Sequence, residues 1–484
     1  MALVTMSTVA LSIPTRARLT PVTKTLIARV GKAVALLILA LTGNGMCMGQ
    51  TIEEAKTVLA NAVKSDATDL EKQRQAKEAR AQLGGPLQGC QLAYYINPLT
   101  EEADQNKFTV IFMKTSLTDA ELLSLIAPLQ QENNLSKLDL RFTKVTGRGF
   151  KELNTITNLT ELDLSSTPLC YEGLCELRCL EQLEKVTLKN TYLRLNGLNF
   201  FLGANSKLRS LDLAGVTVSD DQLKKTSATS LFQTIGELKE LRELDLSGME
   251  LNASDLAALQ QLGKLKKLYL ANTKLTDPLL EKFDFARFAN LTQLSLAGND
   301  LTDKKLAQLA KPAKLTTLNL SGTKLTDVIL LDIVKTNNQL KDLDVSKTTT
   351  MVNLEVLNSF GGLTKLKTLN LSGTGVNDNG LKTIWRSFYP PANFNRQSID
   401  SYLKFIIYYG ALESLDISST RVSDKGLMDD DQQEMGFPML KFINYGDTKV
   451  TSGGINRHIA FFGGIQISSK TGISSAPKVM STKP

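Results

Sequence analysis

One pattern of apolar and polar positions recurs along most of the chain from residue 107 onward. It reads L-x-x-L-x-L-x-x-T-x-[LV]-[TS]-D-x-x-L-x-x-L. The second and third Leu stand two positions apart, which places both on one face of a short strand. Leu residues three apart further along, such as Leu306 and Leu309, favour one face of a short helix. The copies begin at Lys107 (a weaker one), Leu135, Leu159, Leu183, Leu208, Leu241, Leu265, Leu291, Leu315, Leu340, Leu366, Leu412 and Leu440.

Each copy is too small to fold by itself. It buries about six apolar side chains, each worth roughly 1.5–3 kcal/mol. Ordering its backbone costs about 1–2 kcal/mol per residue over roughly 25 residues. Neighbouring copies must therefore stack and share their apolar faces.

The repeat identifies a family resemblance. Segments such as LTTLNLSGTKLTD, residues 315–327, resemble the leucine-rich-repeat family, and the resemblance covers about 350 residues. It implies an α/β fold: a leucine-rich-repeat solenoid (horseshoe) with a parallel concave β-sheet and convex helices, in about 13 repeats. We expect this solenoid to span residues 107–467. The family's usual role implies protein–protein interaction, although a fold does not name the partner.

Two polar positions follow each strand. Thr stands directly after the strand in ten copies, and Asn299 takes that place once. A hydroxyl there can satisfy backbone groups at the turn, and we expect a ladder of such bonds from copy to copy. The pairs Thr302-Asp303 and Ser423-Asp424 predict helix N-caps. This style resembles the subclass with Cys or Thr at the ladder position, used by substrate-recognition subunits of ubiquitin ligases and many bacterial repeat proteins.

The formal net charge of +7 lies mostly in the N-terminal segment. Residues 1–52 hold five basic and no acidic side chains, whereas the rest of the chain holds 51 basic against 49 acidic ones. The repeats therefore carry no basic footprint for a nucleic acid. Basic residues, a short apolar stretch at 33–41 and small residues up to Gly49 are typical of a secretory signal peptide. We predict that residues 1–49 are a signal peptide or export segment.

Alternatives to the signal peptide stay open. Cys47 allows a lipoprotein, and the acid-free start is also compatible with an organelle transit peptide or an effector export signal. The apolar stretch is about half the ~20 residues that span a bilayer. Residues 50–106 predict a helical region and a cap for the first repeat, and residues 468–484 a disordered tail.

Two insertions interrupt the repeats, near residues 224–236 and 385–410. The second is rich in aromatic residues, which are frequent in binding hot spots. Its candidate partner-binding side chains are Trp385, Phe388, Tyr389 and Phe394. The alternative is that the aromatic side chains of this insertion pack on the core.

A polar row accompanies the core Leu residues on the strands and is expected to face the concave surface. Its members are Asp139, Asp163, Thr187, Asp212, Asp245, Tyr269, Ser295, Asn319, Asp344, Asn370, Asp416 and Asn444. At about 4.8 Å per strand the row is roughly 60 Å long. One hypothesis is an acidic, hydrogen-bonding stripe that meets a partner with basic or polar groups. The alternative is that L-D-L-S is a common form of the repeat and serves the scaffold.

The hypothesis selects nine members of this row as partner-binding candidates. They are Asp139, Asp163, Asp212, Asp245, Tyr269, Asn319, Asp344, Asn370 and Asp416. Lys137, Lys185 and Lys267 in the neighbouring row are expected to neutralise the stripe in part.

The chain offers little catalytic or metal-binding chemistry. Cys170, Cys175 and Cys179 cluster in one copy, and the last two share a face of a predicted helix. The single His458 lies about eleven copies away, so zinc lacks a fourth ligand. Buried thiols are the favoured interpretation, and a disulfide from Cys170 is the alternative. We predict no cofactor, no metal and no enzymatic activity.

These observations predict a non-enzymatic protein-binding repeat scaffold, monomeric and exported, secreted or at the cell surface. We expect another protein as its partner, no nucleic acid, and membrane contact only through an uncleaved N-terminal segment. The alternative is a cytoplasmic or secreted-effector adaptor that resembles a ubiquitin-ligase substrate receptor. An enzyme with its site in the insertions or caps is the third candidate.

Overall fold

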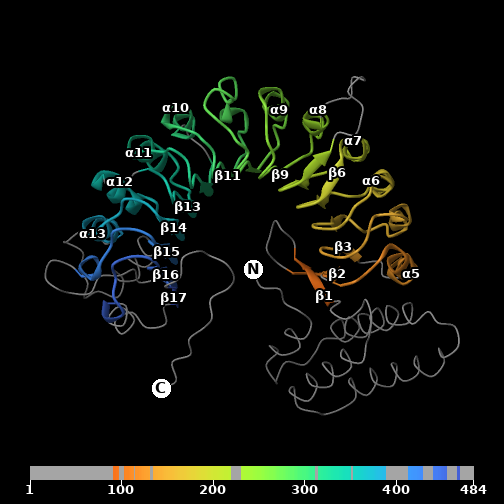
Figure 1. Ribbon diagram of the computed structural model, residues 1–484, viewed down its shortest axis with the longest axis horizontal. Helices are drawn as coiled ribbons and strands as arrows, with labels where there is room; N and C mark the ends of the chain where they lie inside the picture. Colours follow the sequence, from red (N-terminus) through yellow and green to blue (C-terminus); the bar gives the residue numbers. More distant parts are fainter. Residues whose placement is uncertain are drawn as a thin grey trace, which may run out of the picture. The chain divides into compact units, whose positions relative to one another are not determined.

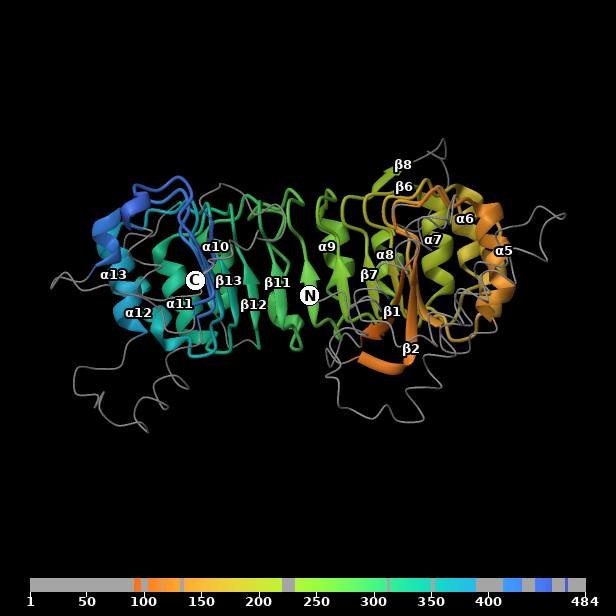
Figure 2. The same ribbon diagram turned by 90° about the horizontal axis from the view of Figure 1, so that it is seen from below.

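The computed structural model describes residues 91–96, 103–113, 115–130, 135–219, 231–310, 314–349, 353–388, 412–428, 440–454 and 466–468. They form two compact units that divide between Leu241 and Arg242. In each unit most of the strands form a parallel sheet, and the helices lie along one face of that sheet (Figure 1, Figure 2). The expected α/β solenoid is confirmed. The predicted export segment 1–49 and the tail after Ser468 lie outside the described residues.

In unit 1 the strands β2, β3, β4, β5 and β7 are parallel neighbours, and β1 pairs antiparallel with β2. The strands β6 and β8 form a separate parallel pair. Its elements are β1 Gln91–Ile96, β2 Ala103–Ile111, α5 Asp119–Gln130, β3 Leu135–Asp139, η2 Phe150–Thr155, β4 Glu161–Asp163, α6 Tyr171–Leu177, β5 Lys185–Thr187, β6 Tyr192–Arg194, α7 Leu195–Ala204, β7 Ser210–Asp212, β8 Thr217–Ser219 and α8 Leu231–Gly236.

In unit 2 nine parallel strands, β9 to β17, follow one another in chain order. Its elements are β9 Glu243–Asp245, α9 Ala253–Leu259, β10 Lys267–Tyr269, η3 Phe285–Arg287, β11 Gln293–Ser295, α10 Asp303–Leu306, η4 Ala307–Ala310, β12 Thr317–Asn319, α11 Asp327–Thr336, β13 Asp342–Asp344, α12 Leu354–Ser359, η5 Phe360–Gly362, β14 Thr368–Asn370, α13 Asp378–Ser387, β15 Ser414–Asp416, η6 Asp424–Leu427, β16 Phe442–Asn444 and β17 Gln466–Ser468.

The core lies between the sheet and the helices. The central apolar residue of each repeat strand, a Leu in most of them, pairs in register with its counterpart in the next strand. Leu268 and Leu294 pair in this way, and both are at most 1% exposed. Helices contribute residues at helical spacing, and the expected pair Leu306 and Leu309 is buried. The opposite face of each strand carries the polar row, so the two-residue period separates core from surface.

In nine of the described copies, the Thr that follows the strand closes its own turn. Each hydroxyl donates to the carbonyl three residues earlier in the same copy, which satisfies a backbone acceptor where the strand ends. The bonds are Thr143–Leu140, Thr167–Leu164, Thr191–Leu188, Thr273–Leu270, Thr323–Leu320, Thr348–Val345, Thr374–Leu371, Thr420–Ile417 and Thr448–Tyr445. The expected copy-to-copy ladder of Thr hydroxyls is wrong, because these bonds stay within one copy.

Asn299 is the exception at this position because its longer amide reaches the preceding copy. Its Nδ2 donates to the Leu270 carbonyl at 2.7 Å, and its Oδ1 accepts from the Thr273 and Leu275 amides at 3.1 and 2.9 Å. One side chain thus ties two copies together.

A different ladder joins several copies, through an Asp that in most of these copies begins the helix. Its carboxylate accepts from the backbone amide of the Thr, Ser or Asn that precedes the next helix, and usually from that residue's hydroxyl as well. The amide bonds of this Asp ladder are Asp119–Thr146 (2.8 Å), Asp277–Thr302 (3.0 Å), Asp303–Thr326 (2.9 Å), Asp327–Asn353 (3.0 Å), Asp378–Ser423 (2.6 Å) and Asp424–Thr451 (2.7 Å).

The expected N-caps are confirmed. The hydroxyls of Thr302, Thr326 and Ser423 each accept from the amide two residues on, at 3.3 Å. The same hydroxyls of Thr326 and Ser423 donate to the preceding Asp of the ladder. One side chain therefore caps its own helix and links it to the copy before.

We predict that Asp303→Ala lowers the free energy of unfolding by about 1–3 kcal/mol, because the amide and hydroxyl of Thr326 lose their acceptor. Urea unfolding followed by circular dichroism measures this loss. Asp300→Ala is the matched control, since Asp300 forms an exposed ion pair with Lys324, and it should cost less than about 1 kcal/mol. Equal losses in the two variants would contradict the Asp ladder.

Candidate functional site

The polar row lies on the helix-free face of each sheet, immediately beside the buried Leu residues. In unit 2 the side chains of Asp245, Tyr269, Asn319, Asp344 and Asn370 are half-buried. The strands place them in register, because Tyr269 pairs with Ser295 and Asn319 with Asp344. The structure therefore brings these sequence-predicted candidates together as one continuous row in unit 2.

The Asp and Asn members of the row share a structural task. In each, one side-chain oxygen accepts from the backbone amide two residues on, at the point where the strand turns. The amide–acceptor pairs are Arg141–Asp139 (3.2 Å), Ser165–Asp163 (3.0 Å), Ala214–Asp212 (2.9 Å), Ser247–Asp245 (2.9 Å), Ser321–Asn319 (2.9 Å), Ser346–Asp344 (2.9 Å), Ser372–Asn370 (3.0 Å), Ser418–Asp416 (2.9 Å) and Gly446–Asn444 (3.0 Å).

This bond explains why Asp and Asn interchange at this position. Both carry a side-chain oxygen at the right distance to form an Asx turn, whereas longer or apolar side chains do not. The scaffold alternative for the Asp row therefore has a physical basis. Among the described residues no partner bonds the second carboxylate oxygen of Asp245 or Asp344, so these two can still accept a bond from outside.

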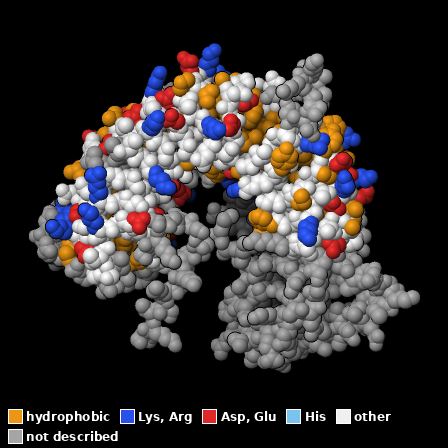
Figure 3. All heavy atoms as spheres, in the orientation of Figure 1, with side chains coloured by type: hydrophobic (Ala, Val, Ile, Leu, Met, Phe, Trp, Pro, Cys, Tyr) orange, Lys and Arg blue, Asp and Glu red, His pale blue; other side chains and the backbone are white. Residues whose placement is uncertain are grey.

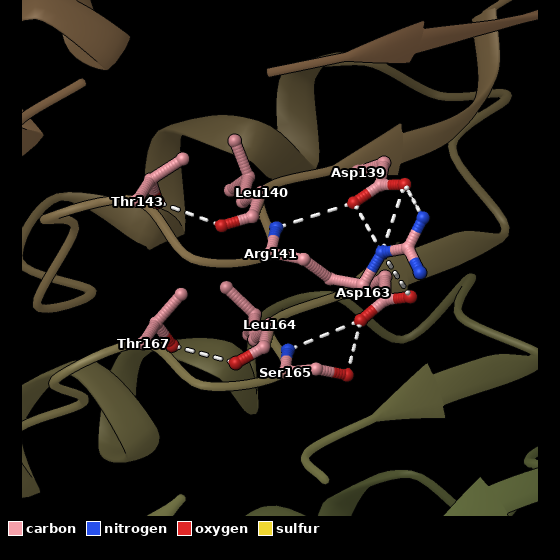
Figure 4. Close-up of polar contacts among 8 residues, drawn as sticks. All are labelled: Asp139, Leu140, Arg141, Thr143, Asp163, Leu164, Ser165 and Thr167. Atoms are coloured by element: carbon pink, nitrogen blue, oxygen red, sulfur yellow. Dashed lines mark hydrogen bonds and ion pairs between the residues drawn. The ribbon is translucent and has the colours of Figure 1, made fainter. Parts of the chain in front are cut away.

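The first two members of the row, Asp139 and Asp163, are both contacted by the side chain of Arg141 (Figure 4). Its guanidinium donates to both carboxylate oxygens of Asp139, at 2.6–3.1 Å, and lies 3.3 Å from the Asp163 carboxylate. Asp139 is only 1% exposed, so it is not available to a partner. Sequence reasoning missed Arg141, although an Arg where most copies have Ser or Ala was the available signal.

Burial and the neighbouring charges shift the pKa values of Asp163 and Arg141. Burial raises the pKa of Asp163, while hydrogen bonds from Ser165 and the charge of Arg141 lower it in part. The hydrogen bond to Asp139 raises the pKa of Arg141. Asp139 and Asp163 thus form an internal charge cluster with Arg141 rather than part of an open acidic stripe.

At the other end of the row, Asp416 is also occupied. Its second oxygen accepts from Asn444 Nδ2 at 3.0 Å, and its first oxygen accepts from the Ser418 hydroxyl at 2.7 Å. Asp416 and Asn444 are 6% and 2% exposed. Asp416 is therefore not accessible as the stripe hypothesis requires.

Tyr269 is the one aromatic side chain among the described members of the row. Its hydroxyl donates to Gln293 Oε1 on the next strand. Burial, with the charges of Glu243 and Asp245, raises the pKa of Tyr269 to about 12, so it is a neutral donor at ordinary pH. Lys267 forms an ion pair with Glu243 at 2.7 Å within its own row.

The aromatic insertion contributes less than expected. Trp385 is 0% and Phe388 3% exposed, because both continue the buried face of α13 begun by Leu381 and Ile384. Burial removes Trp385 and Phe388 from the candidate surface. Tyr389 and Phe394 lie outside the described residues.

The Cys cluster holds neither a disulfide nor a metal-ligand group within the described residues. Cys170, Cys175 and Cys179 are half-buried thiols, where full burial was expected. Cys170 caps α6, since its sulfur accepts from the Gly173 amide at 3.3 Å. Cys179 does not share the helix with Cys175, because α6 ends at Leu177. In the described part of the chain no helix is long and apolar enough to span a bilayer.

We predict that Asp344→Asn leaves the free energy of unfolding within about 0.5 kcal/mol of the wild type, because an amide oxygen still accepts from Ser346. Asp344→Ala should cost about 1–2 kcal/mol, since that amide then loses its acceptor. Chemical denaturation of both variants measures the difference. A large loss for Asn with a small one for Ala would contradict the Asx-turn assignment.

Comparisons with known proteins were made by family and by structure. A family model described as Leucine Rich repeat matches residues 289–304, 311–334, 362–384 and 412–429. A search among curated proteins finds no match.

Three solved structures illustrate the structural likeness. An internalin (inlF) of Listeria monocytogenes has 16% identity and TM-score 0.44, covering 81% of this chain and 99% of that one. A leucine-rich-repeat protein of Leptospira interrogans has 18% identity and TM-score 0.42, covering 70% and 80%. The functional domain of InlJ from Listeria monocytogenes, which includes a cysteine ladder, has 19% identity and TM-score 0.42, covering 74% and 66%.

The family assignment follows from the chain itself and from the matched repeats. Strand, Asx turn, Thr turn and short helix recur at the repeat's own period, and the matched residues include the strands β11, β12, β14 and β15 with most of the helices α11 and α13. The chain is a leucine-rich-repeat protein.

Proposed function

We propose that this chain is a non-enzymatic scaffold that binds another protein on the helix-free face of its sheet. The observation that carries the proposal is the row of polar side chains on β9 to β14 of unit 2, which are half-buried on every strand except β11, where Ser295 is buried. These strands are in register, and their other face is closed by the core. A face of this kind offers a partner many aligned hydrogen-bonding groups on a rigid support.

The proposed surface is narrower than the nine candidates chosen from the sequence. Asp139, Asp163 and Asp416 are occupied by neighbouring side chains, as described above. In unit 2 this leaves Asp245, Tyr269, Asn319, Asp344 and Asn370. Tyr269 adds the aromatic contact that interface centres favour.

The test places a photo-crosslinking amino acid on either face of unit 2. Thr368 and Ser414 are half-buried on the helix-free face, and their side chains take no part in the Asx turns or the Asp ladder. Val328 on α11 is 70% exposed on the helix side and is the matched control. After irradiation of the producing cells, we expect a discrete crosslinked protein from positions 368 and 414 and none from position 328.

Adducts from position 328 alone, or none from any of the three positions, would contradict docking on the helix-free face. An adduct that disappears when the chain carries Asp344→Arg would strengthen the assignment. Asp300→Arg introduces the same charge away from the row and should leave the adduct in place.

We further propose that the chain is exported. The support is the basic N-terminal segment, the apolar stretch at 33–41 and the small residues up to Gly49. We expect N-terminal sequencing of the protein recovered outside the producing cell to begin near Gln50 or Met46. Recovery only from the cytosol, with Met1 intact, would contradict export and favour an intracellular adaptor.

A further inference from the structure

Eight residues at the beginning of the strands of unit 2 form a continuous row. We call them the strand-start row: Arg242, Lys266, Thr292, Thr316, Lys341, Lys367, Glu413 and Lys441. Each backbone amide donates to the carbonyl of the preceding member, at 2.7–2.8 Å. These bonds hold neighbouring members about one strand spacing, roughly 4.8 Å, apart.

The row is strongly basic and open to solvent. Five of its eight members are Lys or Arg and one is acidic. Lys266, Lys341, Lys367 and Lys441 are exposed. Glu413 bonds both Lys367 (3.1 Å) and Lys441 (2.6 Å). Among the described residues neither Lys266 nor Lys341 has an ion-pair partner.

Two other sets of positions carry balanced charge: the strand starts of unit 1 and the turns at the opposite ends of the strands in unit 2. The same row in unit 1 reads Ser136, Thr160, Glu184 and Arg209, and its two charged members pair at 3.0 Å. At the strand-end turns of unit 2, Lys274 pairs with Glu250 and Lys324 with Asp300. On the face shown in Figure 3, basic and acidic side chains are interspersed. The repeat itself therefore does not require an excess of Lys at the strand starts of unit 2.

We propose that the strand-start row binds an extended acidic segment of a protein partner, with carboxylates placed beside Lys266, Lys341 and Lys367. This rests on the proposed function and names the chemistry of the partner. Lys266 and Lys341 have no ion-pair partner among the described residues, and Lys367 shares Glu413 with Lys441, so the row carries positive charge that the carboxylates of a partner offset.

The geometry favours a peptide. The row extends over seven strand spacings, roughly 34 Å, which matches about ten residues of extended chain at ~3.4 Å each. The row is not uniformly positive, because Glu413 and two Thr members interrupt it. A protein segment can alternate acidic and neutral side chains to match this order, whereas a nucleic acid or sulfated polysaccharide would bring anionic groups against Glu413.

The experiment uses the full chain and a fluorescein-labelled ten-residue peptide of alternating Glu and Ser, with a Gln-Ser peptide as the neutral control. Fluorescence anisotropy at low salt measures Kd. We expect binding of the Glu-Ser peptide alone. The double variant Lys341→Glu, Lys367→Glu should weaken it at least about tenfold. The matched variant Lys274→Glu, Lys324→Glu, with the same charge change at the strand-end turns, should change it less than about twofold.

Thermal unfolding checks that both double variants are folded. Equal weakening in the two variants, no binding of the Glu-Ser peptide, or equal binding of the Gln-Ser peptide would overturn the proposal. Tighter binding of heparin or single-stranded DNA with the same dependence on Lys341 and Lys367 would also overturn it. Because the crosslinking at positions 368 and 414 does not involve these lysines, failure here leaves the proposed function standing.

Discussion

The structure depends on satisfying the backbone polar groups at the point where each short strand ends. Because most strands have only three residues, the backbone amides and carbonyls one or two residues beyond the strand have no partner in the sheet. A buried backbone group without a hydrogen-bond partner lowers the stability of the fold. Each copy solves this with its own side chains. In the copy around β12, Asn319 accepts from the Ser321 amide and Thr323 donates to the Leu320 carbonyl. Asp303 then joins this copy to the one before by accepting from Thr326.

Because the Asp and Asn side chains serve the turns, the polar row on the helix-free face is in the first place part of the scaffold. A row of Asp and Asn looks like a binding stripe, yet in each described member one oxygen is already engaged by the turn. In the binding face that we propose, the groups left for a partner are the remaining oxygens of Asp245 and Asp344, Tyr269, and positions that the scaffold does not need. The lysines of the strand-start row are such positions, since unit 1 builds the same row with balanced charge.

Much of the fold was predictable because the repeat's periods encode it. The strand and helix faces, and the N-caps at Thr302 and Ser423, follow from local spacing. The direction of the Thr hydroxyls and the Asp bonds between copies were not predictable, because several backbone groups compete for each side chain. The burial of Trp385 could have been predicted from the sequence, because residues 381, 384, 385 and 388 have helical spacing and extend the apolar face of α13.

The claim that the polar row serves the turns is tested most directly by amide hydrogen exchange at Ser321. Its amide donates to Asn319 Oδ1 at 2.9 Å, although Ser321 itself is partly open to solvent. The account predicts clear protection of this amide in the folded chain, and loss of protection in Asn319→Ala but not in Asn319→Asp. Exchange of the wild-type Ser321 amide as fast as in an unstructured peptide would contradict it.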